Sequence, residues 1–440
     1  MRYRIVYLIF FIFALLVLPI SGWTGEIKIK KVPSPYADYL KGLAAIEEGN
    51  LSSAESYLKK ALKISPRSSE IWSGLAEIYL KTNRLEKALA CFRKARSLNP
   101  RNKEAYYGLG FIYLRLQKPG LARVQYEALL KLCPDEKPVY FLLADLYTSE
   151  KMLYPALGIY QKILKMLPDE AVVFYNYGVI LVQLKKFDSA RENINKTLEL
   201  APNFIPAQVL LARIYQETND IPNAKKTYQA ILEQAPHNRI VLTELAKLYI
   251  DEHNWLESAE TLAKMPEPKD AEILRLLGYL YDRAEEYGKA LTSLEKSLEL
   301  KDNVDSRFYL AITLDHLNRD TEAITELRKL VTAEPENAVT LNYLGYTLVE
   351  RNENLDEAEI LIKKAVRLDP DNGAYLDSLG WLHFKKGNLP FARYYLLKAI
   401  RREEDPEIYQ HLAEVYQRLG RQRKSAYYRN KSSSFQKKKE

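Results

Sequence analysis

The sequence has few of the residues that build disulfide scaffolds, metal centres and turn-rich folds. Its 440 residues include only two cysteines and five histidines. Two thiols exclude a disulfide-stapled module and a cysteine-rich zinc module. Glycine (17) and proline (20) are too scarce for a linker-rich or β-turn-rich chain. We therefore expect no metal, no cofactor and two buried thiols, Cys91 and Cys133.

The chain also lacks an evenly spread charge of one sign. Its formal net charge is +8, but residues 421–440 hold eight lysines and arginines against one glutamate. The remaining residues are nearly neutral, so no extended basic surface is available to hold a phosphate backbone. We expect no nucleic acid partner. Residues 431–440 form a basic tail that we expect to be disordered; it is either a solvated terminus or a contact with anionic lipid headgroups.

One long apolar run is present, at the start of the chain. Arg2 and Arg4 precede sixteen apolar residues, Ile5 to Ile20, and Ser21 and Gly22 follow them. A signal-peptide core has about 7–15 apolar residues and a membrane-spanning helix about 20. We predict that residues 1–25 are an export signal, either cleaved or retained as a membrane anchor. The rest of the chain is then periplasmic, or anchored in the inner membrane and facing the periplasm.

A repeat of 34 residues organises the remaining sequence. Six prolines recur at this spacing: Pro66, Pro100, Pro134, Pro168, Pro202 and Pro236. Two columns of small residues keep the same register; the first includes Gly42, Ala76, Gly110, Ala144, Gly178 and Ala212, and the second Ala54, Ala88, Ala122, Ala156, Ala190 and Ala224. Each unit has two segments with the apolar period of an amphipathic helix. The pattern predicts antiparallel helix pairs that touch at the small residues and bury an apolar face only by stacking.

The unit before Pro100 identifies the family that the chain resembles. Its residues match the tetratricopeptide repeat at Trp72, Leu75, Ala76, Tyr79, Ala88, Phe92, Ala95 and Pro100. The resemblance implies an all-α, right-handed superhelical solenoid of about twelve antiparallel helix pairs between residues 35 and 430. It also implies that the recurring tyrosines Tyr79, Tyr113 and Tyr147 are packing residues. Residues 376–381 are similar to the last units of envelope repeat proteins of Gram-negative bacteria.

The repeats lose their register near residue 265. Two prolines, Pro266 and Pro268, cut one second helix short. We predict a joint at 264–270 that separates an N-terminal array, 35–263, from a C-terminal array, 271–430.

No catalytic motif accompanies the repeats. The sequence has no phosphate loop, no His-Glu-x-x-His, no Cys-x-x-Cys and no nucleophile elbow, so we predict that the protein is not an enzyme. In the family, the first helix of each pair lines a concave wall that binds proteins or peptides. Carried onto this chain, the predicted partner-binding residues are Tyr107, Phe111, Phe141, Tyr175, Arg213, Arg275, Tyr279, Phe308, Asn342, Tyr346 and Trp381.

These features imply a non-catalytic scaffold in the bacterial cell envelope that holds proteins for assembly, secretion or export. An alternative is an accessory or regulatory subunit of an envelope enzyme complex, such as a polysaccharide-synthesis or proteolytic machine. A carbohydrate- or lipid-binding solenoid would need stacked exposed aromatics with polar neighbours. For each of these functions, the N-terminal segment and the basic tail are candidates for contact with the membrane. The partner and the oligomeric state stay open.

Overall fold

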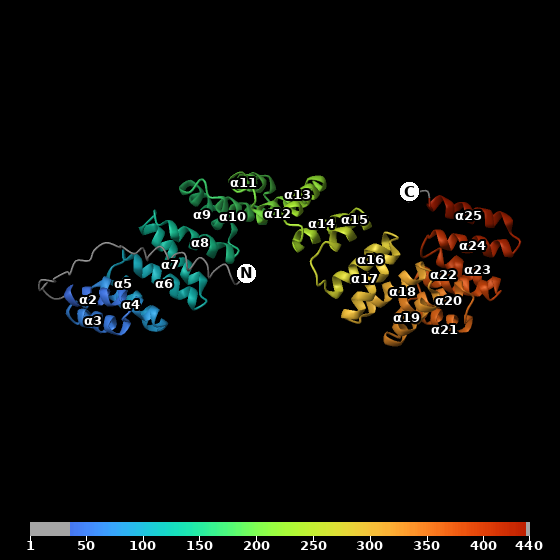
Figure 1. The fold of residues 1–440 in the computed structure, drawn as a ribbon, viewed down its shortest axis with the longest axis horizontal. Coiled ribbons are helices and arrows are strands. Elements are labelled where there is room, and N and C mark those ends of the chain that lie inside the picture. Colours follow the sequence, from blue (N-terminus) through green and yellow to red (C-terminus); the bar gives the residue numbers. More distant parts are fainter. Residues whose placement is uncertain (1–35, 437–440) are drawn as a thin grey trace. The chain divides into compact units, whose positions relative to one another are not determined.

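The computed structural model describes residues 36–436, and these residues are α-helical with short connections (Figure 1). The predicted export segment, 1–25, lies outside the described residues. The chain divides into two compact units, residues 1–227 and 228–440, and each is described by itself. No helix of residues 36–436 has both the length and the apolar character needed to cross a membrane.

The helices follow one another as antiparallel pairs. The first unit contains α2 (Tyr36–Glu47), α3 (Leu51–Ile64), α4 (Ser69–Lys81), α5 (Leu85–Leu98), α6 (Lys103–Arg115), α7 (Pro119–Leu132), α8 (Lys137–Ser149), α9 (Leu153–Met166), α10 (Ala171–Gln183), α11 (Phe187–Leu200) and α12 (Ile205–Glu217). The unit boundary falls inside α13 (Ile221–Gln234). The second unit continues with α14 (Arg239–Asp251), α15 (Trp255–Ala263), α16 (Ala271–Arg283), α17 (Tyr287–Leu300), α18 (Val304–His316), α19 (Asp320–Ala333), α20 (Ala338–Glu350), α21 (Leu355–Leu368), α22 (Gly373–Lys385), α23 (Leu389–Ala399), α24 (Pro406–Arg418) and α25 (Gln422–Gln436). Even-numbered helices are called first helices below, and odd-numbered ones second helices.

Local sequence sets where the helices begin and end. Many first helices start at a side chain that caps their free N–H groups; Asn102, for example, accepts a hydrogen bond from the N–H of Ala105 at 2.8 Å. The turn inside each pair contains a residue of positive φ, such as Asn83 or Gly387, which closes the first helix in the left-handed conformation. Each of the six spaced prolines follows the end of a second helix, as predicted; Pro66 stands just after α3 and its C-cap Ser65.

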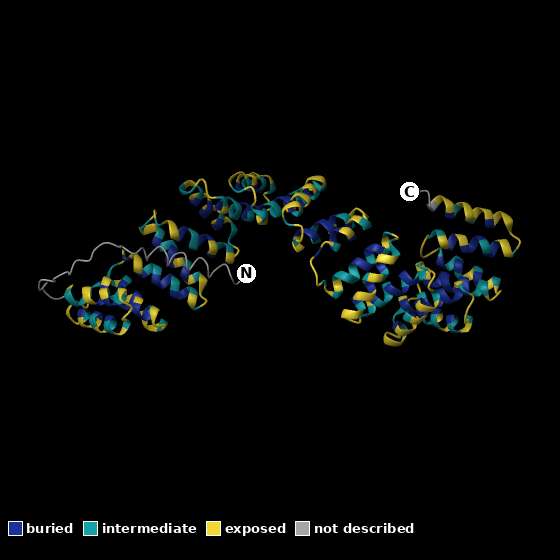
Figure 2. Cartoon of the chain, in the orientation of Figure 1, coloured by how far each residue is buried: buried dark blue, intermediate teal, exposed yellow. Residues whose placement is uncertain are grey.

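The small residues lie where the helices of a pair touch, which confirms the predicted packing. The alanines of the second column are fully buried, among them Ala54, Ala88 and Ala122. A Cβ atom added to Gly110 of α6 would stand 2.5 Å from the ring of Tyr126 on α7. Figure 2 shows the same arrangement as buried residues along the contact faces of the pairs. Large second-helix side chains such as Tyr126 therefore need a small partner on the first helix.

We expect Gly110→Ala to lower the free energy of unfolding by about 1–3 kcal/mol, because the new methyl group overlaps the Tyr126 ring. The matched control is Gly158→Ala on α9, where an added Cβ meets nothing within 4 Å. Since alanine favours a helix over glycine, the control should be neutral or stabilising by up to about 1 kcal/mol. Urea denaturation followed by circular dichroism measures both. Equal stabilities of the two variants would contradict the predicted close approach.

The tyrosines that recur in the repeat are mainly packing residues. Tyr79 and Tyr113 are buried, as the resemblance implied, whereas Tyr147 is only partly buried and its hydroxyl donates to Glu127 at 2.7 Å. Cys91 is a free, buried thiol, and burial raises its pKa to about 11. Cys133 is also free but only partly buried, so the expectation of two buried thiols holds for Cys91 alone.

The chain around residues 264–270 joins α15 to α16. With nine residues, α15 is short, as the two prolines predicted. Leu262 and Leu277, on either side of the segment, belong to one core cluster. The compact units meet at residues 227 and 228 instead. A joint at 264–270 stays a prediction.

The C-terminal helix reaches into the predicted tail. α25 extends to Gln436, so residues 431–436 are helical and not disordered. Ser432 is buried, and its hydroxyl donates to the carbonyl of Pro406 at 2.9 Å. This contact with α24 supports a longer cap than composition indicated. Residues 437–440 lie outside the described residues.

Candidate functional site

The first helices of each unit lie on one side of the stack. Several successive first helices contact one another: α2 with α4, α4 with α6 and α10 with α12 in the first unit, and α16 with α18, α20 with α22 and α22 with α24 in the second. No comparable contact joins successive second helices in the part of the chain that the structure describes. Helices that lie closer together stand on the inner side of a curved stack. We call this inner side the first-helix surface.

In the first unit, this surface carries five of the predicted partner-binding residues. Tyr107 and Phe111 of α6 and Phe141 of α8 are half-buried. Tyr175 of α10 meets Phe204 edge-on, with ring centroids 5.1 Å apart. Arg213 of α12 is exposed. Four aromatic rings are thus partly accessible, and they offer apolar contact area.

Tyr107 packs against a tyrosine of the second helix in its own pair. Its ring lies edge-on to that of Tyr126, with centroids 6.3 Å apart. Burial, followed by the charge of Glu136, raises the pKa of Tyr107 well above its ordinary value. The phenol therefore stays neutral and can donate a hydrogen bond at the edge of the surface.

In the second unit, aromatic rings continue from helix to helix. Tyr279 of α16 lies 5.2 Å from Tyr309 of α18, between ring centroids. Phe308 lies 5.8 Å from Tyr343 of α20 in the same way. All four rings are partly buried. Arg275 adds a guanidinium, 3.9 Å from a carboxylate oxygen of Asp305.

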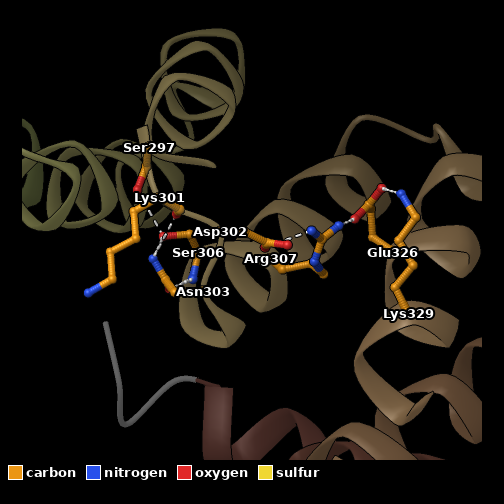
Figure 3. Close-up of polar contacts among 8 residues, drawn as sticks. All are labelled: Ser297, Lys301, Asp302, Asn303, Ser306, Arg307, Glu326 and Lys329. Carbon is orange, nitrogen blue, oxygen red and sulfur yellow. Dashed lines mark hydrogen bonds and ion pairs between the residues drawn. The ribbon is translucent and has the colours of Figure 1, made fainter. Parts of the chain in front are cut away.

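Polar side chains fix the start of α18, which carries Phe308 (Figure 3). Asn303 accepts a hydrogen bond from the N–H of Ser306 at 2.8 Å. Ser297 of α17 donates to the carbonyl of Ala271 at 2.7 Å and contacts the Ser306 hydroxyl. Arg307 pairs with Asp302 at 2.7 Å and with Glu326 of α19. These bonds tie the start of α18 to α16, α17 and α19.

Two further predicted residues, Tyr346 and Asn342, lie on α20. Tyr346 of α20 donates a hydrogen bond to Glu407 of α24, passing over α22. Asn342 is partly buried, and its Oδ1 atom accepts no hydrogen bond from the described residues. The side chains of the last three pairs thus fill much of their own first-helix surface.

Trp381, one of the predicted partner-binding residues, is buried in the structure. Its side chain is only 5% exposed. The indole stacks on His411 of α24, with centroids 4.0 Å apart, and on Phe384, at 4.6 Å. Its N–H donates to Glu350 of α20. The following pair covers Trp381, so the residue supports the wall and offers little area to a partner.

A buried ion pair lies beside Trp381. Nδ1 of His411 is 3.0 Å from both carboxylate oxygens of Asp377, and both side chains are 7% exposed. An Asp–His pair activates a nucleophile only when a hydroxyl or thiol reaches the histidine. Among the described residues no such group is hydrogen-bonded to His411. The described residues also contain no cluster of three His, Cys, Asp or Glu side chains that could hold a metal ion.

One residue of the surface was missed in the sequence. Asp145 of α8 follows Ala144 directly, as Phe111 follows Gly110 and Arg213 follows Ala212. It therefore occupies the column that supplied several predicted residues, among them Phe111 and Arg213. The side chain is exposed, yet desolvation by the surrounding wall raises its pKa to about 6.

Comparison with protein families finds the same repeat in several stretches of the chain. Models described as tetratricopeptide repeat match residues 45–96, 181–239, 275–338, 343–407 and 103–136, and a TPR repeat model matches 76–117. Together these matches cover more than half of the chain.

Two curated proteins are similar to parts of the chain. The TPR repeat-containing protein PA4667 of Pseudomonas aeruginosa is 46% identical over 89 residues, which is 20% of this chain and 15% of that protein. The Homo sapiens protein O-mannosyl-transferase TMTC1 is 25% identical over 238 residues, 46% of this chain and 24% of that protein. The chain thus spans less than a quarter of the length of each relative.

Solved structures with similar folds include a complex of Naa15/Naa10 bound to HypK-THB, which is 16% identical and has a TM-score of 0.48. That match covers 89% of this chain and 67% of the solved one. YrrB, described as a TPR protein with an unusual peptide-binding site, is 19% identical with a TM-score of 0.38, over 42% of this chain and 95% of its own.

Proposed function

Because this chain belongs to the tetratricopeptide repeat family, we propose that it is a non-catalytic scaffold that binds protein partners on its first-helix surface in the bacterial cell envelope. Repeats of this family indicate a scaffold for protein interactions. The proposed role is to hold partners for assembly, secretion or export. A location in the periplasm, or at the inner membrane facing it, follows from the apolar run at Ile5–Ile20.

The observation that carries the proposal is the row of accessible aromatic rings in the first unit. Tyr107, Phe111, Phe141 and Tyr175 stand on three consecutive first helices and are each partly exposed. Rings held on rigid helices lose little conformational entropy on binding, and they are common anchors of protein interfaces. Their spacing along a curved wall suits an extended or helical segment of a partner.

The proposal is tested by replacing Tyr107 and Phe111 together with alanine. Each anchor contributes about 1–2 kcal/mol, so capture of partners should fall at least about tenfold. Circular dichroism should show unchanged helix content, since neither side chain is fully buried. Quantitative crosslinking in intact cells, followed by mass spectrometry, measures the capture.

The matched control is Tyr154→Ala on α9, a second-helix tyrosine that is 68% exposed. This variant should capture partners as the unchanged protein does. Equal capture by the Tyr107/Phe111 variant would refute binding on the first-helix surface. Crosslinking to one stoichiometric enzyme, instead of several proteins, would favour an accessory subunit of an envelope enzyme.

A further inference from the structure

We propose that the first-helix surface of the first unit selects cationic partners: Asp145 pairs with a lysine or arginine that lies beside apolar side chains of the bound segment. This inference rests on the proposed function and narrows it to one chemical class of partner. The ligand is a polypeptide segment that combines basic and apolar residues. The argument depends on the position of Asp145, its surroundings and its lack of a charge partner.

Asp145 stands in the middle of the predicted binding row. It belongs to α8, which follows α6 with Tyr107 and Phe111 and precedes α10 with Tyr175 (Figure 1). Ala144 and Leu146, its neighbours in sequence, are buried, whereas Asp145 is exposed. Asp145 is therefore accessible on the first-helix surface, between the buried residues that hold α8 in place.

The surroundings of Asp145 are mainly apolar, although the phenol of Tyr160 on α9 is close enough for the carboxylate to raise its pKa, after the larger effect of burial. Residues in the same column on the adjacent first helices are Phe111 and Val179. Phe141 lies one turn earlier on α8 itself. A carboxylate that is accessible but poorly hydrated is stabilised by a cation more than a fully solvated carboxylate is. Its pKa of about 6 has desolvation as its cause and agrees with this description.

Neighbouring charges leave Asp145 unaffected. Its raised pKa has desolvation as its cause, without a contribution from a nearby charge. Among the described residues, none forms an ion pair with Asp145. The surface thus presents an anion without a counter-ion, which a ligand cation can supply.

A second acidic site lies further along the same surface. Glu70 and Glu77 of α4 and Glu104 of α6 all raise the pKa of Tyr39 on α2, after the larger effect of burial. Their charges therefore converge around one tyrosine of the first-helix surface. The aromatic residues of α6 lie between this acidic site and Asp145 in chain order. A segment with basic residues on both sides of an apolar stretch complements this pattern.

The experiment is a selection from an unbiased random peptide display library on the full chain. The wild-type protein should enrich peptides in which lysine or arginine stands beside aromatic or aliphatic residues. Asp145→Lys should lose this preference and enrich aspartate or glutamate. The control, Glu192→Lys, makes the same change of charge on an exposed second-helix residue of α11 and should select the wild-type peptides.

The affinity of the most enriched wild-type peptide is then measured by fluorescence anisotropy. Asp145→Asn removes the charge-assisted hydrogen bond to the peptide, and the Kd should rise about tenfold or more. Asp145→Glu keeps the charge and should retain most of the affinity. Circular dichroism and thermal unfolding confirm that each variant is folded.

The outcomes separate this inference from the proposed function. Peptides without a basic preference, whose binding nevertheless depends on Tyr107 and Phe111, would overturn the role of Asp145 and leave the scaffold standing. An unchanged Kd in Asp145→Asn would do the same. If the wild-type protein enriches no peptide, both the scaffold function and the selection of cationic partners are overturned.

Discussion

Replacing Trp381 with alanine is expected to lower the free energy of unfolding of the second unit by about 3–5 kcal/mol, the usual cost of removing a buried tryptophan. The indole is 5% exposed and stacks on both His411 and Phe384. Its removal leaves a cavity among α20, α22 and α24. Hydrogen exchange of the α22 and α24 amides, followed by mass spectrometry, reports the loss locally.

The control for this prediction is Trp72→Ala in α4. Trp72 is only partly buried, and its N–H donates to the carbonyl of Pro66 at 3.0 Å. Its replacement should therefore cost clearly less. A loss in Trp381→Ala no larger than that in Trp72→Ala would contradict the supporting role of Trp381.

Asp377→Ala is expected to have an effect of similar size, about 3–5 kcal/mol, because it leaves the His411 imidazole buried beside no counter-charge. Both partners are 7% exposed, so water cannot replace the carboxylate. Removing both charges, in Asp377→Leu with His411→Phe, should restore most of the stability, since the phenyl ring can still stack on Trp381. Chemical denaturation of the wild type, the double variant and the single variants Asp377→Leu and His411→Phe measures the coupling between the two side chains.

The cost of Asp377→Ala should depend on pH. Burial alone would lower the pKa of His411, but the hydrogen bond and charge of Asp377, with Glu407 and Glu350 nearby, raise it. Burial also raises the pKa of Asp377, which opposes the pairing, but the hydrogen bond and charge of His411 act against that rise. A raised pKa in the folded state stabilises the protein fully below the unfolded pKa of about 6.5 and loses this contribution as pH rises through the folded value. The difference between wild type and Asp377→Ala should thus be largest near pH 6 and shrink in alkaline solution. A difference that grows with pH would show that His411 is neutral in the fold.

The fold could be predicted from the sequence because the same helix–helix contact recurs in every repeat and needs a small residue at the same position. Gly110 and Ala88 are small for a steric reason that applies in every pair, so their spacing alone indicated where helices touch. The same columns located most of the first-helix surface, and Asp145 stood among them.

Exposure within that surface was harder to predict, because it depends on neighbours far away in sequence. Trp381 and Phe111 occupy equivalent positions in their repeats. His411 stacks on Trp381 and covers it, whereas Phe111 is half-exposed. Nothing in the repeat pattern specifies that a histidine of the next pair turns toward the indole. The contact of Ser432 with Pro406, far away in sequence, likewise has no signal in the repeat pattern.

The bond between Tyr346 and Glu407 has a consequence for how such chains can change in length. Most arrays tolerate duplication or deletion of whole modules, since each module meets only those adjacent to it. Here a side chain of α20 reaches α24, beyond the intervening pair. Inserting or removing a helix pair between α20 and α24 would separate Tyr346 from Glu407. Among the bonds described above, none in the earlier helix pairs reaches past a neighbouring pair in this way. Engineered shortening or extension after residue 340 should therefore cost up to about 1.5–3 kcal/mol more than the same change before residue 200, the usual value of a hydrogen bond to a charged group.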